Sequence, residues 1–374
     1  MQIKKAVALC IVLLFAVFGA FAGGQQEGSG DAETTEEAGP IKIGVAGAHT
    51  GDLASYGLPT VKAAELVTEQ VNENGGLLGR QVELVVEDDV CKPEVAANIG
   101  AKLVGEDVVA VIGHICSGAT KAALGIYKDS EIIAISPSAT NPPLTQRGDY
   151  AQARLKVDFA IDELGIEKVA ILHDKGDYGK GLAEFAKIFV EEESAIEMVL
   201  YEGITPGAVD YTAVINKINN SGAEAVIFGG YHPEASKLVT QMRKTGMDIT
   251  FISDDGVKDE TFIKVAGEYA EGVYATGPKD TTSNPLAIEA KERHQEKYGK
   301  DPGAFFLNAY AAAMALYNAI EAAGSTDYDA IREALMAEWV ETPLGEIKFD
   351  EKGDAIGIGF SVYQVQDGEY VEVY

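Results

Sequence analysis

The chain has 374 residues, 47% of them hydrophobic, and 59 acidic against 30 basic side chains give it a formal net charge of −29. This length exceeds that of one typical domain and predicts two lobes once the amino-terminal segment is set aside. The acidic balance argues against nucleic acid or an anionic membrane surface as a partner, because both attract basic patches. Acidity is also common for solubility alone, so it points to no particular function.

The amino terminus has the pattern of an export signal. Residues 1–22 begin with two lysines and continue with an apolar run that ends in Ala20-Phe21-Ala22, which predicts a cleavable secretory signal peptide. An uncleaved anchor is the alternative, although a membrane span usually needs about 20 apolar residues. Residues 23–39 are rich in Gly, Gln, Glu, Ser and Thr and predict a disordered linker. We expect an exported protein whose folded part begins near Pro40.

The first half of the folded part alternates strands with helices, which predicts a parallel sheet covered by helices on both faces. Within it, Ser117 and Thr140 follow the ends of two apolar, β-branched strands. In an open α/β sheet this edge is the ligand crevice, where helix amino termini offer N–H groups to an anion such as a carboxylate. Without a ligand, both residues are explained as helix N-caps, which is the alternative. The expected strands are 41–46, 81–87, 108–112 and 132–135, with helices over 59–74, from Pro93, and between the last two strands.

The alternation restarts after residue 150 and stops near Lys279. The expected strands there are 168–173, 197–202, 225–228 and 249–252, with helices near 182–192, 211–219 and 233–245. Three helices follow, near 285–298, 304–323 and 329–338, and then β-hairpins turned at Lys352-Gly353 and Asp367-Gly368. We predict an α/β fold of two doubly wound parallel-sheet lobes joined by a multi-strand hinge, with a ligand cleft between them. Lobe 1 takes residues 40–150 and 280–357, and lobe 2 takes 151–279 and 358–374.

Two cysteines, Cys91 and Cys116, remain after the predicted signal peptide. Export favours a disulfide. A metal or thiol site that includes His114 is the alternative, and no further Cys or His nearby in sequence completes a tetrahedral set. A hydrolase built from Cys116 or Ser117 with His114 or His173 remains as an enzyme hypothesis, but no catalytic motif supports it. We therefore expect a protein that is not an enzyme.

Seven segments, in order along both predicted lobes, carry a resemblance to a known family. They are GDLASYG at 51–57, EDDVCKPEVA at 87–96, VIGHICSGAT at 111–120, SPSAT at 136–140, HDKGDYGKGLA at 173–183, GGYHPE at 229–234 and DEKGD at 350–354. From Pro40 to Tyr374 the chain resembles the periplasmic leucine, isoleucine and valine-binding proteins, the receptors of branched-chain ABC importers, which have the type I periplasmic binding protein fold. The resemblance implies a monomeric periplasmic receptor without cofactor or metal, which closes on a small amino acid and delivers it to a membrane permease.

The resemblance also implies roles for single residues. Ser117 and Thr140 match positions that bind the ligand carboxylate, Ser138 matches one whose carbonyl faces the ammonium, and Asp255 stands where the family has Glu as the ammonium's counter-ion. A zwitterion bound this way has N–H groups at one end and a buried carboxylate at the other. The remaining implied positions are Ala139 in the ligand set, Tyr56, Tyr178, Tyr231 and Phe305 in the pocket wall, and Cys91 with Cys116 as the disulfide. Core packing is the alternative for the aromatic residues.

The chain departs from the family at two places. Asp255 is one methylene shorter than Glu, and it or Asp254 is alternatively a helix cap. The segment between Arg147-Gly148 and Lys168 is shorter than the family's first crossover, which predicts a weaker or more open hinge. Because fold does not fix the ligand, a receptor for another amino acid or a short amide, and a sensory module, remain alternatives.

Overall fold

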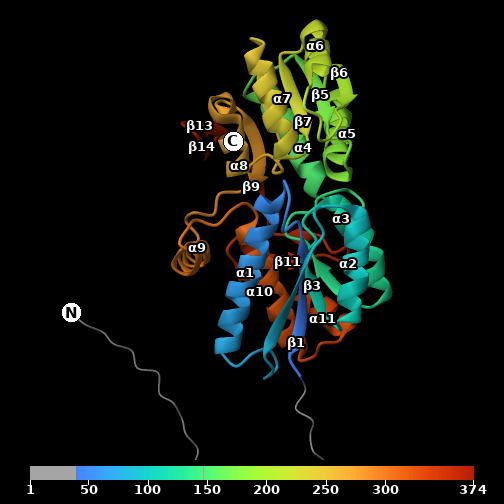
Figure 1. The fold of residues 1–374 in the computed structure, drawn as a ribbon, viewed down its shortest axis with the longest axis vertical. Helices are drawn as coiled ribbons and strands as arrows, with labels where there is room; N and C mark the ends of the chain where they lie inside the picture. The colour runs from blue at the N-terminus through green and yellow to red at the C-terminus, as the bar shows by residue number, and fades with distance from the viewer. Residues whose placement is uncertain (1–38, 146) are drawn as a thin grey trace, which may run out of the picture. The chain divides into compact units, whose positions relative to one another are not determined.

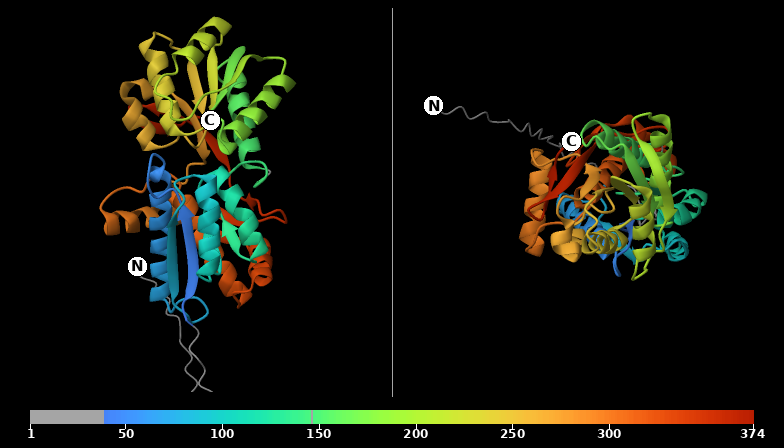
Figure 2. Two further views of the ribbon diagram at one scale, coloured as in Figure 1. Left: turned by 45° about the vertical axis from the view of Figure 1, so that its right-hand side comes forward. Right: turned by 90° about the horizontal axis from the view of Figure 1, so that it is seen from above.

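The computed structural model describes residues 39–145 and 147–374, and residues 39–374 form one compact unit. The predicted signal peptide and all of the predicted linker except Gly39 lie outside the described residues. No helix in the described part of the chain is long and apolar enough to cross a membrane. Two parallel sheets, each covered by helices on both faces, organise this unit (Figures 1 and 2).

The first sheet has four parallel strands in the order β2-β1-β3-β4. The strands are β1 (Ile41–Gly47), β2 (Val82–Asp88), β3 (Ala110–Ile112) and β4 (Ile133–Ile135). One face packs on α2 (Pro93–Gly105) and α3 (Ser117–Asp129). The other packs on α1 (Ala54–Glu73), α10 (Phe306–Ala323) and α11 (Tyr328–Ala337). Helices α10 and α11 therefore cover a sheet whose first strand begins more than two hundred residues earlier in the chain. Helix α9 (Pro285–Tyr298) packs beside α1.

The second sheet has seven strands in the order β14-β13-β9-β8-β7-β5-β6. They are β5 (Lys168–His173), β6 (Glu197–Gly203), β7 (Ala225–Gly229), β8 (Thr250–Ser253), β9 (Tyr274–Pro278), β13 (Phe360–Gln366) and β14 (Glu369–Glu372). Only β13 and β14 run antiparallel to their neighbours. One face packs on α4 (Gly148–Asp162) and α5 (Asp177–Glu192). The other packs on α6 (Thr212–Ser221), α7 (His232–Lys244), α8 (Glu260–Ala266) and the 3₁₀ helix η1 (Gly267–Ala270).

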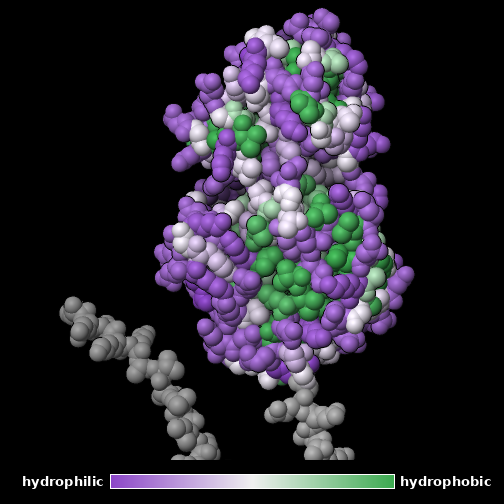
Figure 3. Space-filling view, in the orientation of Figure 1, coloured by the Kyte–Doolittle hydropathy of each residue, from purple (hydrophilic) through white to green (hydrophobic). Residues whose placement is uncertain are grey.

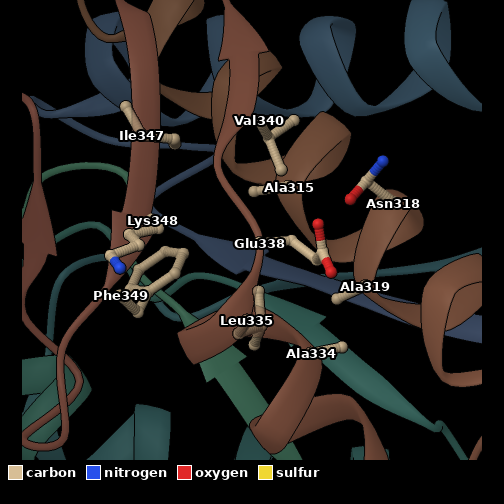
Figure 4. A pocket seen from close by; sticks show the side chains of 10 residues that line it. All are labelled: Ala315, Asn318, Ala319, Ala334, Leu335, Glu338, Val340, Ile347, Lys348 and Phe349. Atoms are coloured by element: carbon tan, nitrogen blue, oxygen red, sulfur yellow. The ribbon is translucent and has the colours of Figure 1, made fainter.

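A small antiparallel sheet of β10 (Val340–Thr342), β11 (Gly345–Phe349) and β12 (Ala355–Ile356) packs on α10 and α11. A gap too small to hold a water molecule lies between these elements, and Figure 4 shows the side chains that line it. Its wall is mostly apolar, from residues such as Ala315, Leu335, Val340, Ile347 and Phe349. It is a packing gap within the first lobe's helical layer. The face drawn in Figure 3 is hydrophilic over much of its area, with hydrophobic residues gathered on its lower half.

The sheets, their helices and the two predicted hairpin turns are confirmed, but several boundaries are not. Helix α1 begins at Ala54 rather than Pro59, so Pro59 lies inside the helix and does not mark its start. Helix α5 likewise begins at Asp177 rather than Leu182. Strand β9 and helix α8 were not predicted. The shortened crossover holds helix α4 and, among its described residues, no strand, while the expected weaker hinge and the lobe boundaries stay predictions.

Candidate functional site

A small cavity of about 10 Å³, roughly the space of one water molecule, lies among the loops that follow strands of both parallel sheets. This position follows from the fold, because the carboxyl ends of parallel strands share one edge. Six of the nine predicted ligand-binding residues line it: Tyr56, Ser138, Tyr178, Tyr231, Asp255 and Phe305. Ile115 and Gly256 complete the lining and were not predicted.

The four predicted aromatic residues contact one another around this cavity. The Tyr56 ring lies 5.5 Å from Phe305 and 6.1 Å from Tyr231, and Tyr231 lies 5.1 Å from Tyr178, measured between ring centroids. Tyr56 comes from the first turn of α1 and Tyr178 from the first turn of α5, so the extra helical residues at both starts carry cavity side chains. The result is an apolar wall assembled from both lobes.

Direct hydrogen bonds join the two lobes beside the cavity. The Tyr56 hydroxyl donates to the Gly256 carbonyl at 2.6 Å, and the Asn141 side-chain amide donates to the Asp177 carbonyl at 2.6 Å. Ser55 Oγ also lies 3.3 Å from His232 Nε2. These contacts hold the lobes together around the cavity in the described conformation.

On the first-lobe side, hydroxyl groups organise the loop after β4, and we call Ser117, Ser136, Ser138 and Thr140 the hydroxyl cluster. Ser117 is the first residue of α3, and its hydroxyl accepts the N–H groups of Thr140 and Asn141, each at 3.3 Å. Ser136 accepts the N–H of Ala139 at 2.9 Å, and Ser138 donates to the carbonyl of Ile115 at 2.9 Å. Ser117, Ala139 and Thr140 thus lie next to the cavity-lining Ser138 but do not line the cavity themselves.

On the second-lobe side, the carboxylate of Asp255 is buried and both of its oxygens are engaged. Tyr178 donates to Oδ1 at 2.5 Å, and the Gln152 side-chain amide of α4 donates to Oδ2 at 3.0 Å. Gln152 is itself fixed, because its oxygen accepts the Thr276 hydroxyl at 2.7 Å. Burial raises the pKa of Asp255, and the hydrogen bonds from Tyr178 and Gln152 oppose that rise.

Helix α4 directs three polar side chains toward the loop that holds Asp255. Asp149, Gln152 and Lys156 are spaced three and four residues apart, so they share one face of the helix, and all three are buried. Lys156 Nζ lies 3.9 Å from Asp254 Oδ2, and neither side chain is exposed. We call Asp149, Gln152, Lys156, Tyr178, Asp254 and Asp255 the carboxylate cluster. Its three α4 members were not predicted, although their spacing within 148–162 was readable.

The structure decides several alternatives left open by the sequence. Cys91 and Cys116 form a disulfide with a Cα–Cα distance of 5.5 Å, as predicted, so Cys116 is neither a metal ligand nor a thiol nucleophile. His114 is buried with its ring nitrogens 2.5 Å from an Asp89 oxygen and 2.9 Å from the Tyr127 hydroxyl. Neither Asp254 nor Asp255 caps a helix, because α8 begins later with Asp259 as its N-cap.

Comparisons with known proteins place the chain among binding proteins. A family model described as periplasmic binding protein matches residues 40–369. A leucine-, isoleucine-, valine-, threonine- and alanine-binding protein of Pseudomonas aeruginosa is 36% identical over 346 residues, 90% of this chain and 92% of that protein. A leucine-binding protein from Thermotoga maritima superposes with a TM-score of 0.83 at 29% identity, covering 89% of this chain and 98% of that one. A branched-chain amino acid transporter substrate-binding protein from Streptococcus pneumoniae, solved with isoleucine, gives a TM-score of 0.79 at 29% identity, covering 89% and 100%.

Proposed function

Because this chain belongs to the periplasmic binding protein family, we propose that it captures a small amino acid, with leucine, isoleucine and valine as first candidates, and delivers it to the permease of an ABC importer. The chain is a solute-binding receptor with the type I periplasmic binding protein fold. Its ligand, its membrane partner, its monomeric state and its periplasmic location are the parts that we propose.

The opposite chemistry of the two sides of the cavity carries this proposal. The buried Asp255 carboxylate offers a counter-ion to an ammonium group. The hydroxyl cluster and the amino terminus of α3 offer hydroxyl and N–H groups to a carboxylate. A free α-amino acid carries both of these charges on neighbouring atoms, so it satisfies both sides at once.

The aromatic wall favours a compact apolar side chain. Tyr56, Tyr178, Tyr231 and Phe305 present ring surface to the cavity, and among the described residues Asp255 is the only carboxylate in its lining. A second charge on the ligand has no partner in this lining, and burying an unpaired charge is costly. Other small neutral amino acids and short amides carry no second charge either, so they are the second candidates. A sensory role is the alternative to transport.

Titration calorimetry with the processed, exported protein tests the proposed ligand. We expect leucine, isoleucine or valine to bind with a Kd of about 1 μM or tighter, which corresponds to about −8 kcal/mol. Two leucine analogues separate the two sides of the cavity: isopentylamine lacks the carboxylate, and 4-methyl-2-oxopentanoate lacks the ammonium. Both should bind far more weakly than leucine. Binding of the oxo acid as tight as that of leucine contradicts the role of Asp255.

A further inference from the structure

Two fully buried side chains of opposite charge, Lys156 and Asp254, lie close to Asp255 but outside the cavity lining. Lys156 of α4 reaches to 3.9 Å from Asp254, which follows β8, and both side chains are 0% exposed. Among the described residues, Lys156 Nζ and Asp254 Oδ1 have no hydrogen-bond partner, while Asp254 Oδ2 accepts the Gly230 N–H at 3.1 Å. Each group is therefore the other's main compensation for loss of water.

Other ionisable groups surround this pair from every element packed against it. They are Asp149 on α4, Tyr178 on α5, Asp174 after β5, Tyr231 before α7, and Asp255 after β8, which Lys258 in turn faces. Burial raises the pKa of Asp149 to about 7 and likewise that of Asp174 to about 7, so both carboxyls gain protons near neutral pH. Of these carboxyl groups, only that of Asp255 lines the cavity.

Burial pushes the pKa of Lys156 down and that of Asp254 up, while their mutual attraction opposes both changes. The pair is neutral overall in either form: as ammonium with carboxylate, or as amine with carboxylic acid. Removing one partner alone leaves a buried charge without compensation, whereas removing both leaves none.

We propose that Lys156 and Asp254 form a charge-neutral pair that positions Asp255 as the single net negative charge met by the ligand's ammonium. This inference rests on the proposed function and narrows the ligand to amino acids with one amino group. A diamino acid brings a second cation for which the neutralised Asp254 is not available. Lys156 and Asp254 are positioning residues, because neither lines the cavity.

Three variants test the pair: Asp254→Asn, Lys156→Met and the double variant. In Asp254→Asn the Asn oxygen can still accept the Gly230 N–H, but Lys156 loses its main partner, and Asp149 and Asp255 are the acids that remain around its ammonium. Lys156 then competes with the ligand's ammonium, and we expect leucine affinity to fall at least about thirtyfold. The double variant removes the competitor, and its affinity should return to within about fivefold of the wild type. Arg154→Met, on the same helix but 37% exposed, is the matched control and should bind like the wild type.

If Lys156 and Asp254 only support the fold, the losses from the two core substitutions should add. The double variant should then bind leucine more weakly than Asp254→Asn. An Asp254→Asn affinity within about threefold of the wild type, or a double variant no better than Asp254→Asn, overturns the proposal. Lys156→Met supplies a second readout, since it frees Asp254 to titrate. Calorimetry in buffers of different ionisation enthalpy, between pH 6 and pH 9, should show more proton exchange on leucine binding than in the wild type. An unchanged proton count contradicts the pair.

The same variants separate failure of the pair from failure of the proposed ligand. If the wild type binds no amino acid, the proposed function is wrong, and thermal unfolding of the ligand-free proteins still tests the pair. Asp254→Asn should then unfold at a lower temperature than the wild type, and the double variant should recover much of the loss. A double variant less stable than Asp254→Asn shows that the two side chains do not neutralise each other.

Discussion

The hydroxyl cluster and the carboxylate cluster face the same cavity but are built in opposite ways. The hydroxyl cluster comes from residues 117–140, where the hydroxyls of Ser117, Ser136 and Ser138 bond to N–H and carbonyl groups of the same stretch. The carboxylate cluster combines side chains from α4, α5 and the loop after β8, and three of its six members are buried carboxyls. The hydroxyl cluster relies on several hydrogen bonds between neutral groups, and the carboxylate cluster relies on a few buried ionisable groups.

This difference determines how each side should respond to mutation. A lost neutral hydrogen bond costs about 1 kcal/mol, because neighbouring donors and water replace part of it. A lost partner of a desolvated charge costs about 2 to 5 kcal/mol, because the remaining charge is left buried. We therefore expect large effects on the carboxylate cluster and small effects on the hydroxyl cluster.

Asp255→Asn should have the largest effect on binding. The change keeps the side-chain shape but removes the charge that we assign to the ligand's ammonium, so leucine binding should weaken by about 2 to 5 kcal/mol. Titration calorimetry measures this loss, and circular dichroism checks that the fold is intact. Glu234→Gln is the matched control, because Glu234 is also a buried acid but accepts the Gly207 N–H away from the cavity lining. If Asp255→Asn binds leucine within about threefold of the wild type, the ammonium is held elsewhere.

The contrast also explains how much of the site could be predicted from the sequence. Ser117 and Thr140 were readable because each follows a strand within one βαβ segment, where the topology fixes their neighbourhood. Gln152 and Lys156 were missed, because a helix face packed on a sheet is expected to be apolar and their spacing alone identifies no partner. On α4 the apolar Ala153, Val157 and Ala160 pack on the second sheet, while polar side chains on the adjoining face meet a loop a hundred residues away. Only the tertiary structure supplies that partner.

The folds of the two lobes were predictable for the same local reason. Strand and helix lengths alternate clearly over most of the chain, so the sheets followed from the pattern. Strand β9 was missed because Tyr274–Pro278 is short and contains Gly and Pro, both of which are uncommon within strands. Its place beside β8 and β13 comes from the sheet and not from its own sequence.

Reducing the Cys91–Cys116 disulfide should give the second largest effect, this time on stability. The bridge links residues 25 apart, and chain entropy assigns a loop of that size about 3 to 4 kcal/mol. Denaturant unfolding with and without reductant measures the difference, with the Cys91→Ser and Cys116→Ser double variant as a control that reductant should not affect. Thiol titration of the denatured, unreduced protein should find no free thiol in the mature chain. Two free thiols contradict the disulfide.

Asp149→Asn should change how stability depends on pH. Burial raises the pKa of Asp149 from 3.8 in the unfolded chain to about 7 in the fold. The folded state therefore binds more protons between these values, and the stability present at low pH is lost as pH rises through about 7. The variant removes this loss and should be more stable than the wild type at pH 8, on the order of 4 kcal/mol, but not at pH 4. Asp162→Asn, at the exposed end of the same helix, should leave the wild-type profile unchanged, and an equal profile for Asp149→Asn contradicts the assignment.

Ser117→Ala should have the smallest effect, although Ser117 lies at the helix terminus that we assign to the ligand's carboxylate. The change removes an acceptor for the Thr140 and Asn141 N–H groups, but it leaves the backbone N–H groups of α3 in place. Leucine affinity should fall by about 1 kcal/mol, or roughly fivefold. Ser136→Ala is the matched comparison, because Ser136 fixes the same loop through Ala139 without lying at the helix terminus. A loss at Ser117 as large as that of Asp255→Asn means that the hydroxyl contacts the ligand directly and that this side is as specific as the carboxylate cluster.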